Sequence, residues 1–253
     1  MLTARLIPCL DVKHGRTVKG VTFDHLTDQG DPIALALAYA ADGADEIVWL
    51  DITATLDDVR PRHEQIARLR SQLRIPLTVG GGIRGVADVE GLIDHGADKV
   101  SINSAALADP RLIEQVAIRW GSQATIVAVD AQWQAGEYRV FSHGGRRDAG
   151  RELGDWLREA EARGAGEFLI TSIDQDGRQQ GYDVTMLRYA RTLVKRPIIA
   201  SGGAGHVNHL ARLLDEGGQY GLLLASLLHG GQTSVGELKR QLHARGYRVR
   251  VPN

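Results

Sequence analysis

The sequence predicts an α/β fold, a (βα)8 TIM barrel assembled from two duplicated half-barrels. One reason is that short runs rich in Val, Ile and Leu alternate with longer segments of helical period, a pattern typical of a parallel sheet covered by helices. The other is an internal repeat: the strand motif ending at Asp11 recurs at Asp130, 119 positions later, and Gly81-Gly82 recurs at Gly202-Gly203, 121 positions later. This period is far longer than a solenoid unit, so it indicates a half-domain that has been duplicated and closed on itself.

Length and composition narrow the class of protein. We expect one domain over residues 1–253, with half-barrels at about 1–121 and 122–253, because barrels of this kind reach this length around a single core. The net charge of −1 predicts neither a nucleic-acid nor a membrane-surface partner. The only cysteine, Cys9, excludes a disulfide framework and favours a reducing compartment, so we expect a cytoplasmic enzyme. No apolar run approaches ~20 residues, so we expect neither a membrane span nor a signal peptide and a mature start at Met1.

Eight strands and eight helices are expected in alternation. The apolar runs place strands near 5–11, 46–52, 76–81, 98–103, 124–130, 167–173, 197–202 and 221–226. The segments of helical period place helices near 32–43, 59–73, 85–95, 109–119, 153–164, 183–194, 205–216 and 234–245. Local signals support these boundaries, since Asp31 followed by Pro32 is typical of a helix start and Gly43, Gly164 and Gly246 stand at C-terminal cap positions.

Two strand-to-helix connections are long, at 12–31 and 131–152. They occupy equivalent positions in the repeat and contain Gly, Arg, His and Lys, so we interpret them as mobile lids over the C-terminal face of the barrel. Lys19 lies in the first of them. It is either a residue that neutralises a substrate phosphate or carbonyl, or an ordinary surface lysine.

Strand parity predicts a pair of carboxylates at the rim of the barrel. Because side chains alternate along a strand, Asp11 shares a face with Cys9, and Asp130 shares one with Ala128. If this face is the interior, both aspartates lie at the end where such barrels carry out chemistry. One carboxylate can then act as a general base and the other as an acid. The alternative is that one or both only cap a loop or hold Lys19.

The same parity predicts a charged floor at the opposite end of the barrel. An unpaired charge in the interior costs several kcal/mol, so two cations and two anions there are expected to pair into a ring. Two interpretations remain open, a structural salt-bridge plug and a polar gate on a passage along the barrel axis. The four residues are Arg5, Glu46, Lys99 and Glu167.

Each half also carries a glycine-rich loop, at 80–82 after the third strand and at 202–205 after the seventh. Backbone N–H groups of such loops can closely approach an anion. The next loop in each half supplies small residues, Asn103-Ser104 and Ala225-Ser226, and adjacent loops of a barrel commonly hold one phosphate. If only one such loop were present, a tight turn that binds no ligand would be a sufficient explanation. Two such pairs predict a substrate that is phosphorylated at both ends.

We predict no metal and no cofactor. The segment 174–177 has its glycine too early for a calcium loop and lacks the closing glutamate. His206 and His209 are three positions apart on a helix, where a solvated face explains them better than zinc does. The sequence has no dinucleotide-binding fingerprint and no serine or cysteine triad.

Motifs spread over most of the chain resemble those of a known family. They lie at Ile7–Lys13, Gly15-Arg16, Val18–Gly20, Gly30–Pro32, Leu50–Ala54, Val79–Ile83, Ala97–Ser104, Thr171–Asp174, Asp176-Gly177 and Ala200–Gly205. In these motifs the chain is similar to the cyclase subunit of imidazole glycerol phosphate synthase, a (βα)8-barrel carbon–nitrogen lyase of histidine biosynthesis.

The resemblance implies a reaction and a partner. With ammonia from a separate glutaminase subunit, in a heterodimer, the family converts the ribulosyl form of phosphoribosyl-formimino-aminoimidazole carboxamide ribotide into imidazole glycerol phosphate and aminoimidazole carboxamide ribotide. By the matching positions, Asp11 would be the acid, Asp130 the base and Lys19 the loop lysine on the substrate. Asp98 would lie on the face that docks the glutaminase.

Further roles are implied for two groups of residues. The charged floor matches the family's ammonia gate: Arg5, Glu46, Lys99 and Glu167. Substrate-binding residues are expected at Gly82, Asn103, Ser104, Thr171, Asp176, Gly177, Ser201, Gly202, Gly203, Ala225 and Ser226.

Some positions depart from the family pattern. Thr27 stands where the family often has arginine, Ala149 where it usually has threonine, and the eighth strand carries bulky residues, Tyr220 and Leu224, in place of small ones. If Leu224 points inward, we expect it to narrow the second phosphate site.

Two alternatives to the cyclase remain. One is the sugar isomerase of the same pathway, a similar duplicated barrel that needs no charged gate and usually has arginine at the position of Lys19. The other is a non-catalytic phosphate-binding or scaffolding barrel.

Overall fold

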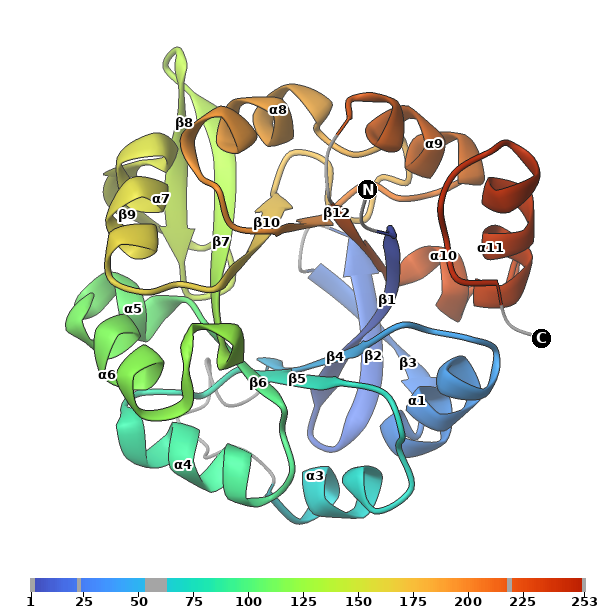
Figure 1. Cartoon of the computed structure of the whole chain (residues 1–253), viewed down its shortest axis with the longest axis horizontal. Coiled ribbons are helices and arrows are strands. Elements are labelled where there is room, and N and C mark those ends of the chain that lie inside the picture. Colours follow the sequence, from blue (N-terminus) through green and yellow to red (C-terminus); the bar gives the residue numbers. More distant parts are fainter. Residues whose placement is uncertain (1–2, 22–23, 53–62, 218–219, 252–253) are drawn as a thin grey trace.

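The computed structural model describes residues 3–21, 24–52, 63–217 and 220–251. Eight parallel strands form a closed barrel at its centre, and helices surround the barrel (Figure 1). The barrel closes because β12 pairs with β1 in parallel, which confirms the predicted α/β (βα)8 fold. The barrel strands are β1 (Arg5–Lys13), β4 (Ile47–Asp51), β5 (Leu77–Gly80), β6 (Lys99–Ile102), β7 (Thr125–Gln134), β10 (Glu167–Ser172), β11 (Ile198–Ser201) and β12 (Tyr220–Leu224).

The outer helices follow the barrel strands at the predicted places. Asp31 caps the first of them, since its side chain accepts a hydrogen bond from the Ala34 N–H at 2.8 Å. Gly43, Gly164 and Gly246 have positive φ angles of 93°, 106° and 86°, as left-handed C-terminal caps require. The helices are α1 (Pro32–Ala41), α3 (His63–Arg70), α4 (Val86–Asp94), α6 (Arg111–Trp120), α7 (Leu153–Ala162), α8 (Val184–Leu193), α9 (Val207–Asp215) and α11 (Val235–Ala244). In the described parts of the chain, no helix has the length and apolar character needed to cross a membrane.

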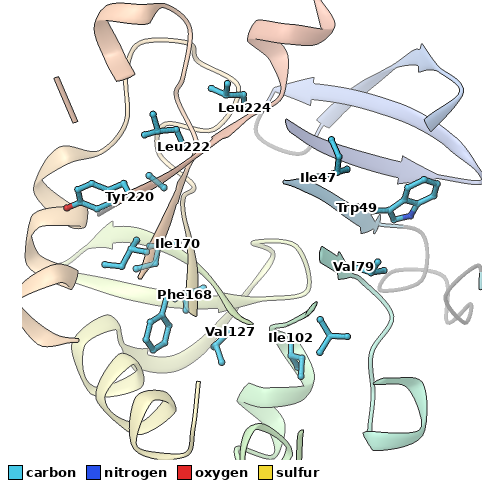
Figure 2. Packing of buried hydrophobic residues seen from close by; sticks show 14 of the residues in the cluster. Ile47, Trp49, Val79, Ile102, Val127, Phe168, Ile170, Tyr220, Leu222 and Leu224 are labelled. Atoms are coloured by element: carbon cyan, nitrogen blue, oxygen red, sulfur yellow. The ribbon is translucent and has the colours of Figure 1, made fainter. Parts of the chain in front are cut away.

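The barrel wall divides the hydrophobic core into two layers. The outer layer packs between strands and helices and includes Trp49 and Phe168 (Figure 2). A smaller inner layer fills the barrel, and Cys9 and Leu169 belong to it. Leu10 lies in the outer layer, so residues 9 and 10 face opposite sides of β1, which confirms the predicted strand parity.

The two long connections contain antiparallel strands that the sequence pattern does not predict. β2 (Arg16–Val21) folds back along β1 and β3 (Asp24–Gly30) pairs with β2, while β8 (Glu137–Ser142) folds back along β7 and β9 (Arg147–Glu152) pairs with β8. β1 and β7 extend past the barrel, and β2 and β8 pair with the backbone groups that this extension exposes. His14-Gly15 and Ala135-Gly136 form the first turns, all with positive φ, as two-residue hairpin loops require.

The bulky side chains of β12, the eighth barrel strand, differ in direction from our expectation. Leu224 belongs to the outer core layer and therefore faces the helices, whereas Leu223 belongs to the inner layer. The expectation that Leu224 narrows the second phosphate site is therefore wrong, because it required an inward side chain. Gly221 keeps the interior open: a Cβ at this position would lie 2.8 Å from Cδ1 of Ile7.

Candidate active site

A cavity of about 580 Å³ opens at the carboxyl ends of the barrel strands. It brings together nearly all the residues predicted to bind or transform a substrate: Asp11, Gly82, Asn103, Ser104, Asp130, Thr171, Asp176, Gly177, Ser201, Gly202, Gly203, Ala225 and Ser226. Lys19 is the exception. Its backbone lies in β2, while its side chain lies outside the described part of the structure.

The two predicted catalytic carboxylates occupy different environments. Burial raises the pKa of Asp130 to about 7, helped by the carboxylate charges of Asp176 and Asp11. A hydrogen bond from Nδ2 of Asn103, at 2.9 Å, opposes this rise because it favours the charged form. Asp11 accepts a weak hydrogen bond from the Cys9 thiol, with the sulfur 3.8 Å from Oδ1.

This difference has a chemical consequence. A carboxyl group with a pKa near the working pH is both available as a base and able to return the proton, which is what general acid–base catalysis requires. Asp130 meets this condition near neutrality. The cavity can therefore move protons on a bound ligand with two carboxylates that lie on β1 and β7, four strands apart in the barrel order.

The glycine-rich loops are held against neighbouring backbone, and a larger residue would not fit. A Cβ on Gly81 would lie 2.0 Å from the carbonyl oxygen of Asp51, and one on Gly203 would lie 2.0 Å from that of Gly181. Both glycines also have positive φ angles, of 92° and 97°. Each loop therefore exposes its backbone to the cavity without an intervening side chain.

A small polar residue accompanies each loop in the cavity wall. Ser104 and Ser226 begin two short helices that the sequence pattern does not predict, α5 (Ser104–Ala108) and α10 (Ser226–His229). The loop pair after β5 and β6 and the pair after β11 and β12 are four strands apart in the barrel order. The cavity can therefore hold two anionic groups on opposite sides, with the carboxylates between them.

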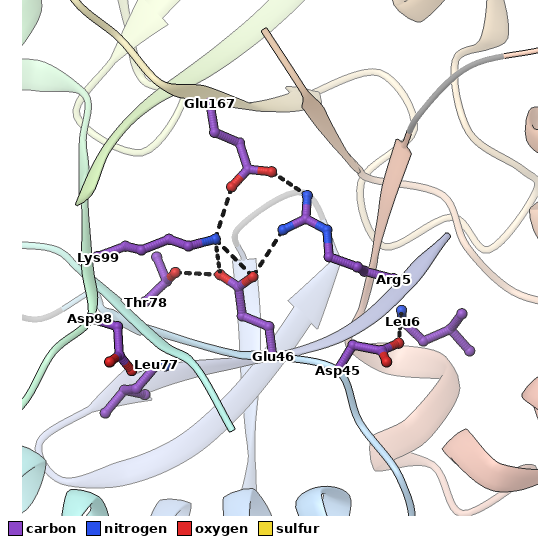
Figure 3. A network of polar contacts seen from close by, with 9 residues as sticks. All are labelled: Arg5, Leu6, Asp45, Glu46, Leu77, Thr78, Asp98, Lys99 and Glu167. Carbon is purple, nitrogen blue, oxygen red and sulfur yellow. Dashed lines mark hydrogen bonds and ion pairs between the residues drawn. The ribbon is translucent and has the colours of Figure 1, made fainter. Parts of the chain in front are cut away.

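The predicted charged floor is present at the amino ends of four barrel strands (Figure 3). Glu46 is 2% exposed and accepts hydrogen bonds from Nη1 of Arg5 and Nζ of Lys99, both at 3.0 Å, and from Oγ1 of Thr78 at 2.5 Å. Glu167 pairs with the same two cations, with Nζ of Lys99 3.1 Å from its Oε2. The four charges form a closed ring, as the cost of unpaired interior charge predicts.

A second cavity, of about 270 Å³, lies on the outer side of this ring. Arg5, Lys99 and Glu167 line it, so the ring separates this outer cavity from the interior of the barrel. Asp98, predicted at a partner interface, is exposed beside Lys99. It accepts a hydrogen bond from the Leu77 N–H at 2.8 Å, and both residues are drawn in Figure 3. It accepts another from Nη1 of Arg70 at 2.9 Å.

Several residues of the main cavity have no counterpart among the predictions. Asp51 is the last residue of β4 and lines the same cavity as Asp11. A search for acidic residues at the ends of strands would therefore have identified it. His143 and Arg146 come from the turn between β8 and β9, and their place depends on a hairpin that the sequence pattern does not reveal.

The histidine pair on α9 has helix-capping contacts. His206 accepts a hydrogen bond from the Asn208 N–H, and His209 accepts one from the Gly205 N–H, both at 3.2 Å. Across the residues that the structure describes, no three side chains of His, Cys, Asp or Glu are grouped to hold a metal ion.

We expect Asp130→Asn to stabilise the fold, and more so at high pH. The pKa of this carboxyl is about 7 in the folded state and 3.8 in the unfolded state, so the native protein loses stability as pH rises from about 3.8 to about 7. A neutral asparagine avoids this loss. The gain in unfolding free energy should be about 3 kcal/mol larger at pH 8 than at pH 5, as urea denaturation would measure. An equal gain at both values would contradict the assigned pKa.

Comparison with known proteins identifies the family. The model of a family described as "Histidine biosynthesis protein" matches residues 5–234. The chain is 48% identical over 252 residues to the "Imidazole glycerol phosphate synthase subunit HisF" of Streptococcus sanguinis (strain SK36), covering 99% of this chain and 100% of that protein. The proteins of the same name from Myxococcus xanthus (strain DK1622) and Nostoc sp. (strain PCC 7120) are also 48% identical, over 250 and 255 residues, with coverage of 99% of this chain and 99% and 98% of those proteins. The chain therefore belongs to the histidine biosynthesis protein family, among the HisF subunits of imidazole glycerol phosphate synthase.

Proposed function

We propose that the chain is the cyclase of histidine biosynthesis, which joins ammonia to the ribulosyl intermediate and releases imidazole glycerol phosphate and aminoimidazole carboxamide ribotide. One observation carries the proposal: a single cavity holds two opposed glycine-loop sites with two carboxylates between them. A substrate with a phosphate at each end would be anchored at both sites, with its reactive centre held beside Asp11 and Asp130. The single cysteine suits a reducing, cytoplasmic compartment.

The reaction needs several proton transfers within this anchored geometry. Ammonia adds to the ketone of the ribulosyl group, water leaves, and ring closure with bond cleavage releases the ribotide. Asp130, with its pKa near 7, is suited to remove protons from the added nitrogen. Asp11 is the partner that returns protons to the leaving oxygen and nitrogen.

We infer that ammonia enters through the charged floor. Sealing the barrel would need only leucines, whereas a ring of paired charges can open when a partner shifts one ion pair. Above the ring the interior is apolar, formed by residues such as Ile7, Val48 and Ile199, so it favours neutral ammonia over the ammonium ion. The relatives are named as subunits, which supports a partner protein, and we place a glutaminase on the face that carries Asp98.

The test supplies two substrates separately to the purified chain. Given the ribulosyl intermediate and an ammonium salt at alkaline pH, the chain should form imidazole glycerol phosphate. Given the precursor of the ribulosyl intermediate, it should do nothing. Isomerisation of the precursor would instead identify the sugar isomerase of the pathway, and no product from either would identify a non-catalytic barrel.

We expect Lys99→Ala and Arg5→Ala to lower glutamine-dependent turnover several-fold more than ammonium-dependent turnover. Each variant breaks the ring on the proposed ammonia route, while ammonium salt in solution also reaches the open cavity at the other end. The measurement is the ratio of the two rates in the complex with the glutaminase.

Arg111→Ala is the matched control, because the exposed Arg111 pairs with the half-buried Asp109 at the start of α6, away from the charged floor. It should leave the ratio unchanged. Equal losses of both rates in the Lys99 and Arg5 variants would favour the salt-bridge plug.

A further inference from the structure

The turn between β8 and β9 contacts one of the two anion sites. The backbone N–H of His143 donates a hydrogen bond to Oγ of Ser104 at 2.9 Å. Because this oxygen acts as the acceptor, the hydroxyl hydrogen of Ser104 is directed elsewhere, and Ser104 lines the cavity. A segment of the second half of the chain thus orients a donor of the first half.

The turn is well defined by its own hydrogen bonds. His143, Gly144 and Gly145 have successive positive φ angles of 55°, 63° and 75°, and the Arg146 N–H donates to the carbonyl oxygen of Ser142 at 3.1 Å. Nδ1 of His143 lies 2.9 Å from Oγ of Ser142. These contacts define the turn, and His143, Gly144 and Arg146 form part of the cavity wall.

The charges in the cavity bear on the role of Arg146. Four aspartates line the cavity, Asp11, Asp51, Asp130 and Asp176, together with the cations Lys13, Arg84 and Arg146. A phosphate group adds a charge of about −1.5 to −2 at neutral pH, so a doubly phosphorylated ligand needs cations close to its ends. In the described part of the chain, Arg146 forms no ion pair with a carboxylate, so its guanidinium is available.

A comparison of the hairpins in the two halves of the chain supports the same role for Arg146. Each half inserts an antiparallel hairpin after its first strand, β2–β3 in one and β8–β9 in the other. Lys19 lies on the first hairpin and Arg146 on the second. Each of the two hairpins therefore carries a basic residue.

We propose that Arg146 is a phosphate-binding residue that completes the anion site of Gly82 and Ser104. The inference rests on the proposed function, because it takes the ligand there to be a substrate phosphate. Arginine offers a planar fork of donors that matches two phosphate oxygens at once. The hairpin of the second half then clamps a phosphate held by loops of the first half.

This role predicts a particular kinetic change. A contact made equally in the bound substrate and in the transition state changes KM and leaves kcat nearly constant. Arg146→Gln should therefore raise KM for the ribulosyl intermediate about tenfold, as expected for loss of a hydrogen bond to a charged group. Arg146→Lys should recover part of this loss, since lysine restores the charge without the fork.

Arg147→Gln is the matched control. Arg147 is the next residue and also exposed, but it begins β9 and does not line the cavity. Ammonium-dependent kinetics would be measured for all variants, together with binding of inorganic phosphate by calorimetry. The expected result is a higher KM and weaker phosphate binding for Arg146→Gln, with Arg147→Gln like the parent chain.

Two outcomes would overturn the inference: an unchanged KM and phosphate affinity in Arg146→Gln, or equal changes in both arginine variants. The proposed cyclase function and the proposed role of Arg146 can be refuted independently of each other. A parent chain that makes no product would refute the cyclase, and the phosphate titration would still decide the role of Arg146.

Discussion

Asparagine in place of either Asp11 or Asp130 is expected to lower ammonium-dependent formation of imidazole glycerol phosphate by about 10²- to 10⁴-fold, the range that a general acid or base contributes. Both carboxylates line the cavity between the two glycine-loop sites. Asparagine has the same shape but exchanges no proton, so KM should change little while kcat falls. Steady-state kinetics with saturating ammonium salt would measure this.

A control and a pH profile separate this loss from a structural effect. Asp31→Asn should retain full activity, since Asp31 caps α1 and asparagine is an equally good cap. At a fixed concentration of free ammonia, the rate of the parent chain should rise with pH through about 7 as Asp130 ionises. Full activity of Asp11→Asn or Asp130→Asn would contradict the assigned roles.

Glu46→Ala is expected to destabilise the fold by about 3 kcal/mol, near the lower limit for breaking a buried ion pair. Arg5 and Lys99 would then share only Glu167, and the hydroxyl of Thr78 would lose its acceptor. The lower limit applies because the Arg5 and Lys99 side chains remain 29% and 19% exposed, so solvent relieves part of the repulsion. Urea unfolding monitored by circular dichroism gives this free energy.

The matched control is Glu90→Ala. Glu90 pairs with Arg119 between exposed side chains, where an ion pair contributes about 0 to 1 kcal/mol. A similarly small loss in Glu46→Ala would contradict this expectation and show that the ring adds little to stability.

The barrel and its polarity could be predicted from sequence because they depend on local patterns. Apolar runs and helical periods recur in order, and alternation along β1 places Cys9 inward and Leu10 outward in the structure as in the sequence pattern. The charged floor followed from the same alternation combined with the cost of unpaired charge. The direction of such a side chain depends on its own strand alone. It can therefore be predicted without knowing which strands lie beside it.

Features that depend on pairing between segments were less predictable. β9, over Arg147–Glu152, is polar and largely exposed, so it has no apolar alternation and forms because β8 presents an edge to it. Leu223 and Leu224 differ by one position, and a shift of one residue exchanges the two faces of a strand. The cavity residues of the β8–β9 turn were missed for the same reason, because contact with Ser104 arises only after the hairpin has formed.

The most direct test of the proposed chemistry follows one nitrogen atom. The purified chain would be given the ribulosyl intermediate and ¹⁵N-ammonium chloride, and both products would be analysed by mass spectrometry. Because ammonia adds to the ketone and remains in the ring that closes, the label should appear in imidazole glycerol phosphate and not in aminoimidazole carboxamide ribotide, with the two products formed in equal amounts. Label in the ribotide, or an absence of labelled imidazole glycerol phosphate, would contradict the account.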